Sequence, residues 1–201
     1  MRATELVAQL NGLRIFTTRD LAILGRMSPA TASQSLLRLA ADGLVVRLRR
    51  GIWANKTAAR LHPAEAVQHL AHPWPAYISL HTALSIHGLI EEVPMVVQAI
   101  SPKIPGKRST PLGEIRFHHL PARLMWGHAT HRIGPASFPL AEPEKALLDL
   151  AYLALIPRSP LGFPRKRTRR WALNRSLLLA YARRFSFPPL LDWATQEAMA
   201  A

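Results

Sequence analysis

The chain has 201 residues, and 49% of them are hydrophobic, so it can bury a core in one large domain or two small ones. Its 26 Lys and Arg residues exceed its 12 Asp and Glu residues by 14, and it has no cysteine, which excludes a disulfide framework and a thiolate metal site. The N-terminus lacks the apolar core of a signal peptide, and the longest mostly apolar run, residues 146–156, is too short to cross a bilayer. We therefore expect a cytoplasmic protein with no membrane partner.

The positive charge is unevenly distributed along the chain. Residues 1–60 contain 10 basic and 3 acidic residues, residues 61–150 contain 7 of each, and residues 151–201 contain 9 basic and 2 acidic residues. A neutral middle between two ends of net charge +7 indicates two surfaces that face a polyanion, most simply nucleic acid.

A first helix is predicted to begin after Thr17. The Thr17 side chain can cap this helix, with Asp20 three residues on as its capping-box partner. Leu21 and Leu24 are expected to form its buried side, and Gly25 can close it in the left-handed conformation.

A second helix is predicted from Ser28-Pro29 to Asp42-Gly43, with Ser28 as the cap. Pro29 occupies the first helical position, where its missing N–H removes no hydrogen bond of the helix. Its core face has apolar residues at helical spacing, namely Ala32, Leu36 and Leu39. Another face is polar at the same spacing and comprises Thr31, Gln34, Ser35 and Arg38.

A β-hairpin with a basic tip is predicted to follow. Leu44, Val46 and Leu48 alternate with Val45, Arg47 and Arg49, as in a half-buried strand; Arg50-Gly51 makes the turn, and residues 52–54 return. Two short helices and such a hairpin are typical of a winged helix-turn-helix, whose second helix enters the DNA major groove.

The polar residues of this unit suit two kinds of DNA contact. On the polar helix face, Arg suits guanine and Gln suits adenine, so this face is predicted to read base edges of double-stranded DNA. Phosphate contacts are predicted for the basic residues on or just after the hairpin, namely Arg47, Arg49, Arg50 and Lys56. The alternative is a polar face that is merely solvated, with arginines that only confer solubility; the basic hairpin favours DNA binding.

Sequence breakers and the change in charge over residues 55–62 predict a domain boundary, with a winged helix-turn-helix domain over 1–60 and a second domain over 61–201. An opening helix with Leu6, Leu10 and Leu13 would complete the first domain. The second domain opens with Tyr77-Ile78, and strands are expected at 95–100 and 114–120 and on both sides of Gly134-Pro135, with 103–113 as a loop. Helices are expected from Pro63, from Ser79 as a cap, as one turn at 124–127, and from Pro143. Without regular βαβ alternation, this pattern predicts an α+β fold.

The densest basic run precedes the last two predicted helices, over residues 174–185 and from Pro188. It comprises Arg165, Lys166, Arg167, Arg169 and Arg170. Such a run can be a solvated linker or a second surface for DNA, RNA or an acidic partner, and both interpretations stay open.

Catalytic and metal chemistry is not expected. The nine histidines include three close pairs, but no carboxylate pair or thiolate completes a metal set. The segment Gly106–Thr110 lacks the first glycine and the final Ser or Thr of a phosphate loop. Glu142 and Glu144 fit a helix start, and Lys145 and Asp149 fit a helical charge pair, so these four need no catalytic role. We expect no cofactor, no metal and no enzyme activity.

Three blocks of the second domain carry a family resemblance: YISLHTALSIHGLIEEVP from Tyr77, the strand IRFHHL from Ile115, and AEPEKALLDLAYL from Ala141. In combination these blocks resemble the AbiEi antitoxin family of bacterial abortive-infection toxin–antitoxin pairs, and the N-terminal winged helix fits that family's two-domain plan. The resemblance implies an antitoxin that represses its own operon, opposes a nucleotidyltransferase toxin encoded beside it, and carries antitoxin activity in its C-terminal domain. The basic run at 165–170 is not part of the pattern.

The leading hypothesis is therefore an antitoxin and DNA-binding autorepressor whose operator contains inverted repeats. Two alternatives stay open: a nucleic-acid-processing enzyme with a winged-helix targeting domain, and a plain winged-helix transcription factor with a ligand-sensing C-terminal domain. A neighbouring gene for a nucleotidyltransferase would favour the first hypothesis. Direct contact between antitoxin and toxin, and the oligomeric state, do not follow from the sequence.

Overall fold

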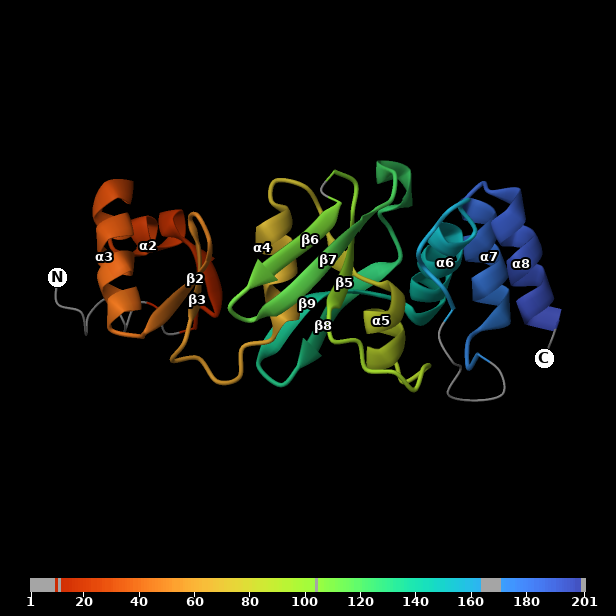
Figure 1. Ribbon diagram of the computed structural model, residues 1–201, viewed down its shortest axis with the longest axis horizontal. Coiled ribbons are helices and arrows are strands. Elements are labelled where there is room, and N and C mark those ends of the chain that lie inside the picture. The colour runs from red at the N-terminus through yellow and green to blue at the C-terminus, as the bar shows by residue number, and fades with distance from the viewer. Residues whose placement is uncertain (1–9, 11, 104, 164–170, 200–201) are drawn as a thin grey trace.

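The computed structural model describes residues 10, 12–103, 105–163 and 171–199 and has the predicted α+β fold. Three groups of helices and strands follow one another along the long axis of the molecule (Figure 1). The N-terminal helices α2 and α3 lie at one end with a small sheet, a six-stranded sheet lies in the middle, and helices α6, α7 and α8 form the other end. No helix within the described ranges is long and apolar enough to cross a membrane.

Helix α2 spans Thr18–Leu24 and begins as predicted. The Thr17 hydroxyl accepts a hydrogen bond from the backbone N–H of Asp20 at 3.2 Å, and the Asp20 carboxylate accepts one from the backbone N–H of Thr17 at 2.7 Å, which completes a capping box. Two predictions at its other end are wrong: Leu24 is 47% exposed, and Gly25 has a φ of −82°. The N–H of Gly25 still bonds to the carbonyl of Leu21, so the left-handed residue falls one position later, at Arg26 with a φ of 47°.

Helix α3 spans Pro29–Ala41 and confirms the predicted start, end and core face. The Ser28 hydroxyl accepts a hydrogen bond from the backbone N–H of Thr31 at 3.1 Å, and Gly43 follows the helix with a φ of 73°. Its three predicted core residues are at most 1% exposed and pack with Phe16, Leu21 and Trp53.

The wing belongs to a three-stranded antiparallel sheet of order β1-β3-β2, with β1 at Ile15–Thr17, β2 at Val45–Arg49 and β3 at Ile52–Asn55. The predicted alternation is wrong in part, because Val45 and Leu48 are the buried residues of β2. The pairing register shifts between Arg47 and Arg49, and such a bulge reverses the faces that follow it.

The six-stranded sheet is mixed and has the order β6-β7-β5-β4-β9-β8. Strand β5 runs parallel to β7, and β4 runs parallel to β9, while the other neighbours are antiparallel. Its strands are β4 at Tyr77–Ile78, β5 at Val97–Ser101, β6 at Gly106–Thr110, β7 at Gly113–His119, β8 at His128–Ile133 and β9 at Ala136–Ala141.

Two strand predictions in this sheet need correction. Residues 103–113 were expected as a loop, yet Gly106–Thr110 form the edge strand β6, whose side chains stay largely exposed and so give no burial pattern. Strand β5 begins at Val97 and not at Met95, whose side chain is 94% exposed.

Residues 61–199 form the second part of the protein, whose helices cover the six-stranded sheet and close its far end. They are the 3₁₀ turn η1 at Pro63–Ala66, α4 at Val67–Ala71, α5 at Leu80–Ile86, the 3₁₀ turn η2 at Ala122–Leu124, α6 at Pro143–Ala154, α7 at Arg175–Arg184 and α8 at Pro188–Met199. The helical turn expected at 124–127 thus lies two residues earlier. Ser79 occupies the cap position of α5, but its side chain makes no capping hydrogen bond.

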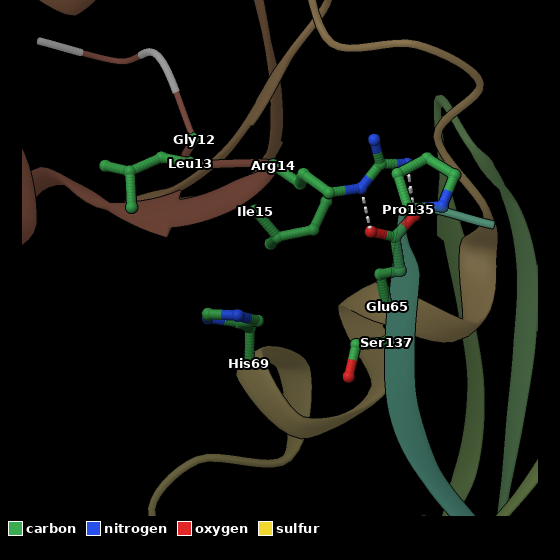
Figure 2. Close-up of a pocket in the computed structure, with 8 residues that line it drawn as sticks. All are labelled: Gly12, Leu13, Arg14, Ile15, Glu65, His69, Pro135 and Ser137. Carbon is green, nitrogen blue, oxygen red and sulfur yellow. Dashed lines mark hydrogen bonds and ion pairs between the residues drawn. The ribbon is translucent and has the colours of Figure 1, made fainter. Parts of the chain in front are cut away.

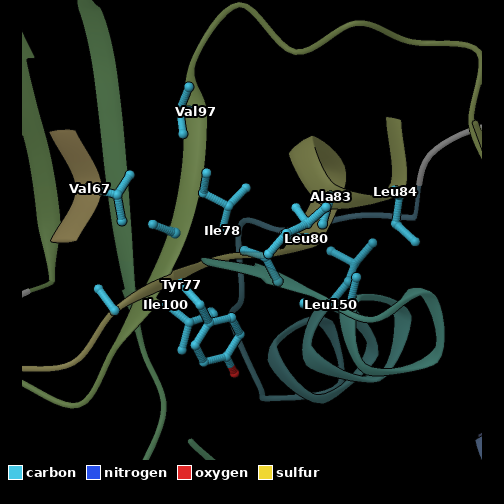
Figure 3. Packing of buried hydrophobic residues seen from close by; sticks show 14 of the residues in the cluster. Val67, Tyr77, Ile78, Leu80, Ala83, Leu84, Val97, Ile100 and Leu150 are labelled. Atoms are coloured by element: carbon cyan, nitrogen blue, oxygen red, sulfur yellow. The ribbon is translucent and has the colours of Figure 1, made fainter. Parts of the chain in front are cut away.

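One large core unites these elements. Figure 3 shows Tyr77, Ile78 and Leu80 packed between strand β5 and helix α6, where Leu150 faces them. The same buried cluster reaches three residues of the small sheet, Ile15, Leu48 and Ala54. The N-terminal part is therefore packed against the rest of the protein through its sheet.

Candidate nucleic-acid interface

The predicted base-reading residues share one exposed side of α3. Thr31, Gln34 and Arg38 are exposed and Ser35 is half-buried. Helix α3 lies at the outer end of the molecule, with the three-stranded sheet between it and the six-stranded sheet (Figure 1). The Thr31 hydroxyl lies 2.9 Å from the Ser28 hydroxyl, so it is engaged at the helix cap, whereas Gln34 and Arg38 are exposed.

Sequence reasoning missed the apolar residues at the centre of the same exposed side. Ala30, Leu37 and Ala41 are exposed, and Leu37 is 54% exposed. These positions lie opposite the core face, so the helical period could have identified them. Small and aliphatic side chains beside Gln34 and Arg38 are the types that contact a thymine methyl group.

The basic residues of the wing do not form one patch. The Arg47 guanidinium lies 5.8 Å from the centroid of the Trp53 ring, whose N–H donates to the Thr18 hydroxyl at 3.0 Å. Lys56 lies at the open end of the hairpin, where its backbone N–H bonds to the carbonyl of Leu44. Arg49 and Arg50 lie at the turn, about 15 Å away at the rise of a β-strand.

The turn arginines line a cleft between the wing and α4. Arg19 from the start of α2, which sequence reasoning missed, joins Arg49 and Arg50 on one wall of this cleft, whose volume is about 810 Å³. The opposite wall carries His69, His72 and Trp74. No local sequence pattern indicates this grouping, because its members lie on three separate elements.

An ion pair between the half-buried Arg14 and the buried Glu65 fixes the N-terminal part to the second part (Figure 2). The Arg14 guanidinium donates to both carboxylate oxygens of Glu65, at 2.5 and 3.0 Å, and to the carbonyls of Ala59 and Arg60 at 2.7 and 2.8 Å. Glu65 also accepts from the backbone N–H of His62. The position of the wing relative to α4 is therefore held by directional bonds as well as by apolar packing.

A second buried network joins β4, the start of α5 and α6. Lys145 and Asp149 form the predicted helical pair, but both are fully buried. The Asp149 carboxylate also accepts from the hydroxyls of Tyr77 and Ser79, at 2.9 and 2.8 Å, and Lys145 donates to the Tyr77 hydroxyl. Burial lowers the pKa of Lys145 and raises that of Asp149, and their mutual contact opposes both shifts.

The surroundings of Lys145 are aromatic. Its ammonium lies 5.0 Å from the ring centroids of Trp126 and Phe185 and 5.2 Å from that of Tyr77. A charge pair enclosed by rings and satisfied by internal hydrogen bonds serves as a structural centre of the second part.

Some histidines lie near one another: the ring centroids of His87 and His131 are 6.5 Å apart, and His69 and His72 line the same cleft. His87 is half-buried and is hydrogen-bonded through Nε2 to the carbonyl of Ala141 at 2.8 Å. Burial lowers the pKa of His118 to about 4. Within the described ranges, no three His, Cys, Asp or Glu side chains are grouped to hold a metal ion.

The basic run of Arg165, Lys166, Arg167, Arg169 and Arg170 lies outside the described residues. Helices α7 and α8, on its C-terminal side, pack onto α6 through Leu178, Phe185 and Leu190, as part of the main core.

Helices α2 and α3 with the β2–β3 hairpin define a winged helix-turn-helix protein, a class that binds DNA through its second helix. Residues 4–56 match a protein family described as transcriptional regulator, AbiEi antitoxin. This match confirms the resemblance to the AbiEi antitoxin family, and the matched residues are those of the winged helix-turn-helix. The three blocks between Tyr77 and Leu153 lie outside the matched range. No match was found among curated proteins.

Proposed function

We propose that this protein is an antitoxin and a DNA-binding autorepressor of a toxin–antitoxin operon, and that it is not an enzyme. The observation that carries the proposal is that the segment matching AbiEi antitoxin regulators is a helix-turn-helix whose second helix exposes Gln34 and Arg38. A transcriptional regulator needs such an exposed polar helix to distinguish base pairs.

Operator recognition would place α3 in the major groove. Gln34 and Arg38 would hydrogen-bond base edges, with Ser35 and Thr31 beside them. Arg47, Arg49, Arg50 and Lys56 would bind phosphates, which position the protein without reading sequence. Because Lys56 is separated from the wing turn, it would contact a different phosphate from Arg49 and Arg50. Two copies on inverted repeats would double each set of contacts.

The toxin-directed function is proposed for residues 61–201, and the operator function for residues 1–60. The region 61–150 has 7 basic and 7 acidic residues, so it is a poor phosphate-binding surface and is free for another role. The opposed toxin would be a nucleotidyltransferase encoded beside this gene.

The test uses the full chain, because deleting residues 1–60 would leave the buried Glu65 without Arg14 and uncover the core at Ile15, Leu48 and Ala54. The double variant Gln34→Ala/Arg38→Ala should lose repression of a promoter–reporter while still protecting growth against the neighbouring toxin. The matched control is Arg132→Ala, which removes an exposed arginine from β8 and should retain both activities. Repression that survives the double variant contradicts the operator assignment, and failure of the wild-type chain to protect contradicts the antitoxin assignment.

A further inference from the structure

The cleft between the wing and α4 combines cationic and aromatic chemistry outside the base-reading helix. Arg19, Arg49 and Arg50 form one wall, and Trp74 with His69 and His72 forms the other. Its volume of about 810 Å³ lies within the range of small-molecule binding sites. The Arg14–Glu65 pair fixes the two walls relative to each other.

Among the residues that the structure describes, none forms an ion pair with Arg19, Arg49 or Arg50. The ion pairs within the described ranges join Arg14 to Glu65, Lys107 to Glu114 and Lys145 to Asp149. The cleft contains one carboxylate, that of Asp20, and it accepts hydrogen bonds from the backbone N–H and the hydroxyl of Thr17 at 2.7 and 2.9 Å. Three guanidinium groups on one concave wall therefore attract an external anion, and their planar forks match phosphate oxygens.

Trp74 supplies a flat apolar surface on the opposite wall. Its side chain is 42% exposed, and its backbone N–H is bonded to the carbonyl of Ala71 at 3.0 Å, which fixes the turn that presents it. The Lys103 ammonium lies 5.7 Å from the ring centroid. An exposed indole near positive charge is a stacking surface for a nucleic-acid base, because every base has a π-face.

We propose that this cleft binds an unpaired nucleotide, with its phosphate held by Arg19, Arg49 and Arg50 and its base against Trp74. The nucleotide can be a free nucleoside phosphate or part of a single strand; a duplex does not present an unstacked base. The site goes beyond the proposed reading of an operator, since that reading uses neither Arg19 nor Trp74. Because Arg49 and Arg50 serve both surfaces, a bound nucleotide and a duplex compete at the wing turn.

The experiment titrates the full chain with three probes at fixed ionic strength: inorganic phosphate, adenosine 5′-diphosphate, and a single-stranded oligonucleotide of six residues. The variants are Trp74→Ala, Trp74→Phe and Arg19→Ala. Matched controls are Phe163→Ala, whose ring is 44% exposed on another surface, and Arg132→Ala. Circular dichroism and a thermal melt show that each variant is folded.

Trp74→Ala and Arg19→Ala should each weaken binding of the nucleotide probe about tenfold, while Trp74→Phe and both controls change it less than about twofold. Phosphate should bind more weakly and be insensitive to Trp74→Ala. If Trp74→Ala weakens binding of adenosine 5′-diphosphate, the ligand is a free nucleotide. If it weakens binding of the oligonucleotide alone, the ligand is a single strand. The proposal is overturned if no probe depends on Trp74, or if Arg132→Ala weakens binding as much as Arg19→Ala. Operator repression is measured separately with Gln34 and Arg38 variants, so the two proposals fail independently.

Discussion

The two halves of the molecule use charged residues in opposite ways. In the N-terminal part, Arg19, Arg49 and Arg50 line an open cleft and take part in none of the described ion pairs. In the second part, Lys145 and Asp149 are fully buried and bound to each other. Net charge alone therefore does not locate a binding surface. What matters is whether a cation is already satisfied within the protein, because only an unsatisfied one has binding energy left for a partner.

The buried pair gives the largest expected effect. Lys145→Ala removes the partner of a fully buried carboxylate, so we expect the free energy of unfolding to fall by about 3–5 kcal/mol. Urea denaturation of the full chain measures this change. The double variant Lys145→Met/Asp149→Leu removes both charges and should recover most of the loss. A fall of less than about 1 kcal/mol for the single variant contradicts a structural role for the pair.

Arg14 is a cation of the N-terminal part that is satisfied within the protein, through its contact with Glu65. Arg14→Ala leaves a buried carboxylate with only the His62 N–H as a donor, so we expect a loss of about 2–4 kcal/mol in unfolding free energy. As a control, Lys107→Ala breaks an exposed ion pair with Glu114 and should leave the unfolding free energy nearly unchanged. Similar losses in the two variants would remove the distinction between a buried and an exposed pair.

The stability of the protein is also expected to depend on pH, through the half-buried ring of His118. The folded-state pKa of His118 is about 4, below the ordinary 6.5, because its burial favours the neutral ring. Between these values the unfolded state binds more protons than the folded state, so stability falls as the pH falls from about 6.5 to about 4.

His118→Gln does not titrate, so its stability should fall less over this range, by about 1–3 kcal/mol relative to the wild type. Urea denaturation at pH 7 and pH 4.5 provides the comparison. Because burial also lowers the pKa values of His62, His69 and His128, part of the acid sensitivity should remain in the variant. An unchanged difference between the two pH values would assign the whole effect to other groups.

The smallest expected effect concerns the wing turn. Arg49→Ala and Arg50→Ala should each lower affinity for operator and non-operator duplexes alike, and each should reduce the slope of log affinity against log salt by about one phosphate contact. Lys56→Ala at the other end of the hairpin should act independently and additively, because it is too far away to share a phosphate. Slopes identical to that of the wild type would show that the wing does not contact DNA.

Local signals predicted the helix-turn-helix well. The capping box at Thr17 and Asp20, the Ser28-Pro29 start and the core face of α3 depend on neighbouring residues, so a short stretch of sequence contains the whole cause. Three details were predicted wrongly: the burial of Leu24, the left-handed conformation of Gly25 and the alternation in β2. A one-residue shift of the turn or of the strand register moves a side chain to another face without any change in composition.

The tertiary groupings could not be predicted in the same way. Strand β6 exists because β7 offers it hydrogen bonds, although its own side chains remain exposed. The spacing of Lys145 and Asp149 predicted their pairing, but only the packing of β4 and α5 around them makes the pair buried. Arg19 and Trp74 are far apart in the sequence and meet across a cleft that depends on the Arg14–Glu65 contact.

The central claim is that α3 reads the operator, and a binding titration tests it most directly. The full chain, Gln34→Ala and Arg38→Ala are titrated at one salt concentration against a duplex from upstream of the gene and against a scrambled duplex of the same composition. We predict that each variant loses about 1–3 kcal/mol of binding free energy on the operator and almost none on the scrambled duplex. Equal losses on both duplexes would contradict the claim, because they would show that Gln34 and Arg38 contact the DNA backbone rather than the bases.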